Sequence, residues 1–226
     1  MRLLPLILAF PMFAYAHTPL TTVELVCPIG GEKFKMAQVG SSFISNRYLD
    51  LRPFGPGPAP WPLAKCPSNG FVIFRDKFSD SELDQLREFV ATSEYRELTR
   101  IHRNYYLAAV LQRHIQAPPE QVAFTLLQAT WQATSKQQYK HYAQEALDGY
   151  RVLLNEPNPD KEKWTTYQLV AGELERRIGN FDDATKRFSE LKNSHPDDAH
   201  IQEIIQLQLS LIADRNTGTQ LMPKKK

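Results

Sequence analysis

The segment from Trp164 to Pro196 constrains the fold more than any other stretch of the sequence. Its pattern predicts two antiparallel helices joined at Gly179-Asn180, because both residue types tolerate the positive φ at which many helices end. Gly172 and Ala184 are twelve residues apart, and each is small enough to let a neighbouring helix approach closely. Pro196, another twelve residues on, stops the second helix. The chain is therefore expected to contain a tightly packed helical hairpin.

Aromatic residues complete this pattern. Phe181 and Phe188 lie three residues before and four residues after Ala184, so the three share one helix face. Small, small, aromatic and proline positions at these offsets resemble the tetratricopeptide repeat, although Gln168 stands at the family's first aromatic position. The resemblance implies stacked helical hairpins, with a concave groove lined by the first helix of each pair.

A similar hairpin precedes this one in the chain. Ala146 anticipates the position of Ala184 by 38 residues. We therefore expect two repeat-like hairpins, at about 120–155 and 161–194, followed by a capping helix at Asp197–Arg215. The exposed side of that last helix is expected to carry its glutamines, Gln202, Gln206 and Gln208.

Helical periodicity begins at Ser79, which is spaced from Glu82 as in a capping box. One longer helix is expected to follow, from about Ser93 to Ile115. Its inward-facing residues are predicted to be Leu98, Ile101, Tyr105, Leu107, Ala108 and Leu111.

The N-terminus predicts export. Residues 1–16 combine the basic Arg2, the apolar stretch Leu3–Phe13 and the A-x-A cleavage pattern Ala14-Tyr15-Ala16. An uncleaved anchor or a buried helix is the alternative, which Pro5 and Pro11 disfavour. We expect a signal peptide and a periplasmic protein with no stable membrane span after cleavage. The formal net charge of +2 gives no reason to expect a nucleic-acid partner.

Two short segments share one pattern, Cys27-Pro28-Ile29-Gly30-Gly31 and Cys66-Pro67-Ser68-Asn69-Gly70. They resemble the two Cys-Pro-x-Cys-Gly knuckles of a zinc ribbon, in which four thiolates hold one ion. Gly30 and Asn69 stand where the second cysteine of each knuckle belongs, so we expect neither bound zinc nor another cofactor.

The resemblance to paired knuckles implies that Cys27 and Cys66 are close in space. In an oxidising compartment we expect them to form a disulfide that replaces the metal. Two unpaired buried thiols are the alternative. The strand candidates beside the knuckles, Val23–Val26 and Phe71–Phe74, are expected to pair with each other.

A proline-rich stretch separates the knuckles. Five prolines lie in the ten residues from Pro53 to Pro62, which excludes a helix and favours polyproline II. The stretch is either a rigid loop that a partner binds, or a stiff connector whose Phe54 and Trp61 pack on the core of its own module.

Knuckles, a helical pair and repeat-like hairpins in this order resemble the bacterial domain of unknown function 2225. The resemblance rests on Cys27-Pro28, Gly31, Phe34, Cys66-Pro67, Gly70-Phe71 and the segment Gly179–Ala184. It implies an α+β, mainly α fold: a degenerate zinc-ribbon β module at 17–78, a tetratricopeptide-like helical domain at 79–215 and a basic tail at 216–226.

Catalytic signatures are missing from the sequence: it has no nucleophile elbow, phosphate loop or paired His-Glu metalloprotease motif. Glu173, Glu175, Arg176 and Arg177 follow one another closely on a predicted helix, where a solvated face with ion pairs is the simplest interpretation. We therefore do not expect an enzyme.

These observations predict an exported, non-catalytic interaction module that offers a helical groove to a peptide or protein of the envelope. The alternative is a periplasmic protein that binds zinc or copper through Cys27, Cys66 and a histidine. The candidate groove residues are Tyr105, Trp131, Trp164, Tyr167 and Arg176.

Overall fold

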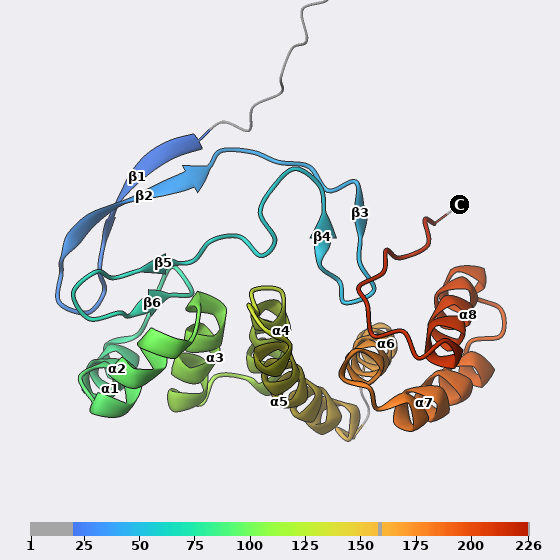
Figure 1. The fold of residues 1–226 in the computed structure, drawn as a ribbon. Coiled ribbons are helices and arrows are strands. Elements are labelled where there is room, and N and C mark those ends of the chain that lie inside the picture. The colour runs from blue at the N-terminus through green and yellow to red at the C-terminus, as the bar shows by residue number, and fades with distance from the viewer. Residues whose placement is uncertain (1–19, 158–159, 226) are drawn as a thin grey trace, which may run out of the picture.

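The computed structural model describes residues 20–157 and 160–225 (Figure 1). The predicted signal peptide, 1–16, lies outside these residues. Short β segments come first in the chain and a row of helices follows, as the α+β, mainly α prediction required. Within the described chain, no helix is long and apolar enough to cross a membrane.

The strands form three separate antiparallel pairs, each between neighbours in sequence. β1 (Leu20–Val26) pairs with β2 (Lys33–Val39), and β5 (Ala64–Lys65) pairs with β6 (Val72–Ile73). The expected pairing of the two knuckle strands with each other is therefore wrong. Each knuckle is the turn of its own hairpin, so the strands that flank it pair locally. The third pair is β3 (Asn46–Arg47) with β4 (Pro53–Phe54).

The helices of the described chain are α1 (Asp80–Val90), α2 (Ser93–Ile101), α3 (Asn104–His114), α4 (Pro119–Thr130), α5 (Lys136–Leu154), α6 (Lys161–Ile178), α7 (Phe181–Ser194) and α8 (Ala199–Ala213). The two predicted hairpins are confirmed as α4–α5 and α6–α7, with α8 packed on α7. The capping box at Ser79 and Glu82 is also confirmed, at the start of α1.

The single helix expected from Ser93 to Ile115 is wrong, because the chain is extended at His102 and Arg103. Interactions with distant residues accompany this break: the His102 ring nitrogen Nδ1 lies 2.6 Å from the Tyr142 hydroxyl. Asn104 at the start of α3 donates from Nδ2 to the Leu63 carbonyl at 2.7 Å. Ile101, expected to face inward, is instead 56% exposed at the end of α2.

The close approach predicted at Gly172 is confirmed. A Cβ atom placed there would lie 2.5 Å from Cζ of Phe188, so only glycine leaves room for this ring. Gly179 ends α6 in the left-handed conformation, with φ of 91°, and its amide donates to the Arg176 carbonyl. Local sequence signals thus account for the α6–α7 hairpin.

One hydrophobic cluster joins the knuckles to the first helices. Cys27, Cys66 and Phe71 belong to the same buried cluster as Tyr95 in α2 and Leu107 in α3. A second cluster fills the space between α3, α4, α5 and α6. The core therefore continues across residue 78, where the predicted β module ends.

Two extended segments, residues 47–63 and 216–222, lie against α3, α4, α6 and α8 (Figure 1). We call the helix surface beneath them the covered face. Leu51 and Leu63 pack against the cluster of α3 to α6, while Leu49 joins Ile204 and Leu211 of α8 in a further cluster. The side of the stack expected to form an open groove is therefore largely occupied by the chain itself.

Candidate functional site

The two knuckles have equivalent backbones. The Cys27 amide donates to the Glu32 carbonyl at 2.8 Å, and the Cys66 amide donates to the Phe71 carbonyl at the same distance. In both knuckles the glycine four residues after the cysteine has a positive φ, 71° at Gly31 and 74° at Gly70. The two Cys-Pro turns thus share one backbone geometry, as their shared sequence pattern predicts.

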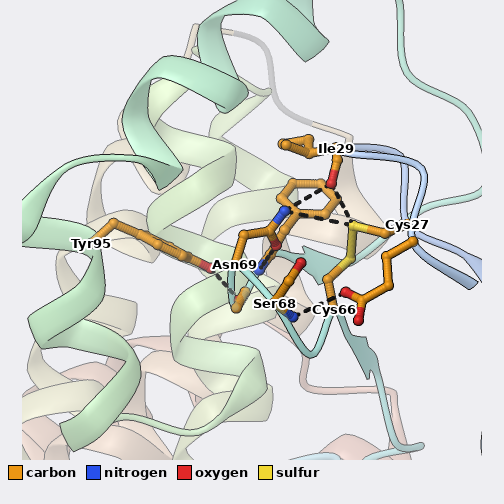
Figure 2. Close-up of a disulfide and its surroundings, with 9 residues drawn as sticks. Cys27, Ile29, Cys66, Ser68, Asn69 and Tyr95 are labelled. Atoms are coloured by element: carbon orange, nitrogen blue, oxygen red, sulfur yellow. Dashed lines mark hydrogen bonds between the residues drawn. A yellow bond between two sulfur atoms is a disulfide. The ribbon is translucent and has the colours of Figure 1, made fainter. Parts of the chain in front are cut away.

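The sulfur atoms of Cys27 and Cys66 lie at disulfide distance, 2.08 Å apart, beneath the two turns (Figure 2). Asn69, which stands where the resemblance to a zinc knuckle would place a cysteine, connects the knuckles: its Nδ2 donates to the Ile29 carbonyl at 2.8 Å. The Tyr95 hydroxyl donates to the Gly70 carbonyl at 2.9 Å and fixes the second knuckle to α2. The two sulfur atoms that a metal would need as ligands are therefore bonded to each other.

The metal-binding alternative needs a third ligand near the cysteines. Among residues 20–157 and 160–225, no three His, Cys, Asp or Glu side chains are grouped so that they could hold an ion. Asn69 and the Ile29 carbonyl are the groups that face the sulfurs (Figure 2).

The five predicted groove residues do not form one surface. Tyr105 is buried and its hydroxyl donates to the Trp61 carbonyl at 2.9 Å, so it holds the proline-rich loop. Trp131 lies at the end of α4 near that loop. Trp164 packs with α7 and α8, and Tyr167 packs 5.6 Å from the Tyr150 ring. Arg176 is fully buried and cannot be reached from solvent.

Arg176 belongs to an internal ionic network, so the expectation of a solvated charged face on α6 is wrong. Its guanidinium binds the Glu173 carboxylate at 2.8 Å, and its Nε donates to Oε1 of Gln208 in α8 at 2.9 Å. Gln208, expected on the exposed side, is buried with them. Burial raises the pKa of Glu173 to about 7, although the Arg176 charge opposes this shift.

A second buried pair connects the covered face to residues 47–63. Arg177 of α6 binds the Asp50 carboxylate at 3.2 Å and lies over the Tyr139 ring, 4.3 Å from its centroid. Burial raises the pKa of Asp50, with the Arg177 charge acting in the opposite direction. Glu175, on the other side of α6, is buried between Arg151 and Arg187. The charges on α6 therefore join segments of the fold to one another.

The polar cluster that comes nearest to a catalytic arrangement lies between α3 and α5. The Tyr106 hydroxyl donates to the Glu145 carboxylate at 2.7 Å, and His141 lies 3.0 Å from the same group. Burial and the nearby His141 lower the pKa of His102, whose ring lies 4.1 Å from the Tyr106 ring. Arg113 also binds Glu145. Each of these groups already has a partner in the fold.

An aromatic cavity of about 320 Å³ lies between the proline-rich loop and α4. We call it the aromatic pocket. Trp61 and Phe124 are 46% and 43% exposed there, and Trp131 has an indole N–H that finds no partner within the described residues. The loop residues therefore pack on the helices. The interpretation in which they pack on the knuckle core is wrong. The lining consists of Arg47, Leu51, Pro53, Pro58, Pro60, Trp61, Phe124, Gln128 and Trp131.

Sequence reasoning identified Trp131 and the proline-rich loop but missed Phe124 as a surface residue. In the sequence Phe124 falls among the apolar residues of its helix, and nothing in the periodicity separates a core aromatic from one at the rim of a pocket. Phe124 and Trp61 line one pocket because the loop crosses α4. This arrangement is a tertiary feature that local sequence does not reveal.

Fold and site together define a class: a two-knuckle module joined at two cysteines, built onto a stack of helical hairpins. Residues 20–212 match a family model described as an uncharacterised protein conserved in bacteria, domain of unknown function 2225. The chain belongs to this family, as its motifs indicated. No match was found among curated proteins or among solved structures.

Proposed function

We propose that this protein is an exported, non-catalytic interaction module that binds an extended segment of another envelope protein. The observation that carries the proposal is the aromatic pocket, which is lined by two half-exposed aromatic side chains, Trp61 and Phe124, and by three prolines. Aromatic residues in such a cavity are typical anchors of protein–protein interfaces. Because the covered face is filled by residues 47–63 and 216–222, the pocket takes the place of the long groove as the docking site.

The chemistry of the pocket favours one kind of ligand. Its walls are apolar, and its charged residue is Arg47, whose guanidinium donates to the Leu51 carbonyl and enters none of the ion pairs of the described residues. An extended peptide with an apolar anchor side chain beside a carboxylate would fill the cavity and pair with this guanidinium. Export is supported by the signal-like residues 1–16 and by two cysteines at disulfide distance, which fits an oxidising compartment.

Site-specific photo-crosslinking in the native cells tests this proposal. A photoreactive phenylalanine analogue at Phe124 should give one discrete adduct, recovered from the periplasmic fraction. The matched control is the same analogue at Val152, which is exposed on α5 away from the pocket residues. Arg47→Glu should weaken the Phe124 adduct at least fivefold. Equal labelling at both positions, or adducts confined to the cytoplasm, would contradict the proposal.

A further inference from the structure

The segment after α8, Asn216–Met222, crosses the covered face in an extended conformation, and we call it the tail segment. Its end pairs with the chain near β3: the Leu49 amide donates to the Gln220 carbonyl at 2.9 Å, and the Met222 amide donates to the Arg47 carbonyl at 2.8 Å. Tyr48 and Leu221 form an antiparallel bridge between these bonds. The tail segment thus adds a short third strand to the β3–β4 pair.

The beginning of the tail segment is held by a buried cation. Arg176 donates from Nη1 to the Asn216 carbonyl and from Nη2 to the Gly218 carbonyl, the latter at 3.0 Å. Glu173 and Gln208 fix the same guanidinium from within α6 and α8, so its direction does not depend on the tail segment. Two N–H groups of this arginine therefore point at the path of the tail segment and require carbonyl acceptors there.

Among the side chains of the tail segment, Met222 makes the apolar contact with the helices. Met222 packs on the cluster of Leu49, Ile204 and Leu211, whereas its neighbour Leu221 is 40% exposed. Residues 216–222 carry no charged side chain, which fits an arginine already neutralised by Glu173. A surface that holds extended chain by backbone groups and one apolar anchor accepts many sequences, as in β-strand addition.

We propose that this surface is a second peptide-binding site, that the tail segment is its built-in occupant, and that an uncharged extended segment of a partner protein displaces it. The partner segment must supply two carbonyls two residues apart for Arg176 and an apolar side chain at the place of Met222. The tail segment lies beyond residue 212, where the family match ends, so the matched part of the fold does not include it. This site goes beyond the aromatic pocket, and its test does not use that pocket.

A trans-binding experiment on the full chain tests the proposal. The probe is a fluorescently labelled synthetic peptide with the sequence of residues 216–223. Met222→Asp places a carboxylate against Leu49, Ile204 and Leu211 and should release the tail segment. Leu221→Asp is the matched control, because neighbouring residues in a strand point to opposite faces and this one is exposed. We expect the M222D chain to bind the peptide at least tenfold more tightly than the wild-type and L221D chains.

Amide hydrogen exchange at Leu49 reports the state of the site. Its protection should fall in M222D, because its acceptor is the Gln220 carbonyl, and should return when the peptide is added. A peptide with aspartate in place of the methionine should neither bind nor restore protection. If M222D loses its helical circular dichroism, the milder Met222→Ser is used and the same order of affinities is expected.

Four results would overturn the proposal. One is a fully exchanging Leu49 amide in M222D without peptide binding at millimolar concentration. Another is equal affinity for all three chains, and a third is continued protection of Leu49 in M222D, since Met222 would then not be the anchor. A wild-type dimer that exchanges its tail segments would give the site to a second copy, and would likewise overturn the assignment to a partner protein.

Discussion

Asn69 of the second knuckle and Ile29 of the first are joined by a hydrogen bond that connects the two turns. Nδ2 of Asn69 donates to the Ile29 carbonyl at 2.8 Å, Oδ1 accepts from the Phe71 amide at 2.9 Å, and Nδ2 lies 3.8 Å from Sγ of Cys27. The side-chain amide thus joins the first turn to the second. The resemblance of the two turns to zinc knuckles, with Asn69 at the position of a cysteine, makes this residue the place to test for metal binding.

Asn69→Cys should restore metal binding under reducing conditions. The new thiol would lie beside Cys27 and Cys66, and three thiolates on a fixed frame bind zinc or cadmium far better than two. We expect about one equivalent of Cd²⁺, followed by its ultraviolet thiolate absorption. Reduced wild-type protein and Ser68→Cys, whose side chain is exposed, are the controls and should retain little metal. Equal metal content in all three proteins would show that the knuckles no longer form a metal frame.

Removal of the Cys27–Cys66 bond should destabilise the fold strongly. The cysteines are 39 residues apart, and closing a loop of this size stabilises by about 4 kcal/mol on the chain-entropy model. The double change Cys27→Ala and Cys66→Ala should therefore lower the urea midpoint. Reductant should lower the midpoint of the wild-type protein as well and leave the variant unchanged. A wild-type midpoint that does not respond to reductant, with two free thiols by intact mass, would contradict the bond.

Gly172→Ala should destabilise the α6–α7 hairpin by about 1–3 kcal/mol, although alanine is the better helix former. The reason is overpacking, because the new methyl group would meet the Phe188 ring at 2.5 Å. Phe188→Leu removes that clash, so Gly172→Ala should cost less in this background. Chemical denaturation of the four proteins measures the coupling. Additive effects of the two substitutions would mean that the new methyl group at position 172 does not clash with the Phe188 ring.

The buried Glu173 predicts a stability that depends on pH. Its native pKa of about 7 exceeds the ordinary value of 4.5, so the folded state binds more protons between these two pH values. This contribution is complete below about pH 4.5 and is lost as the pH rises through about 7. The unfolding free energy of the wild-type protein, measured relative to Glu173→Gln, should therefore fall between these limits. A difference that rises instead would mean that Arg176 outweighs burial.

The helical part of the fold could be predicted because its signals are local. Periodicity, the capping box at Ser79, Gly179 and the small residue Gly172 all lie within single hairpins or caps. The knuckles could be predicted from two short motifs. The strand partners could not, because two strands of similar composition fit either a local or a distant partner.

The candidate site was harder to predict because segments far apart in sequence create it. The sequence around Arg176 is typical of a solvated helix face. In the structure Gln208 and the carbonyls of Asn216 and Gly218 surround its guanidinium. The break at His102 depends on contacts with Tyr142 and Leu63, not on a helix breaker. An open groove was expected because no local signal shows that residues 47–63 and 216–222 cover it.

The pairing of residues 47–49 with 220–222 has a consequence for how the molecule comes apart. In an open array of repeats each unit contacts its neighbours alone, and the terminal helices fray first. Here α8 contacts a segment that precedes the helices in the chain, since Leu49 packs on Ile204 and Leu211. The end of the helical array is thus held by a segment that precedes the array in the chain. Loosening of either part should therefore loosen the other.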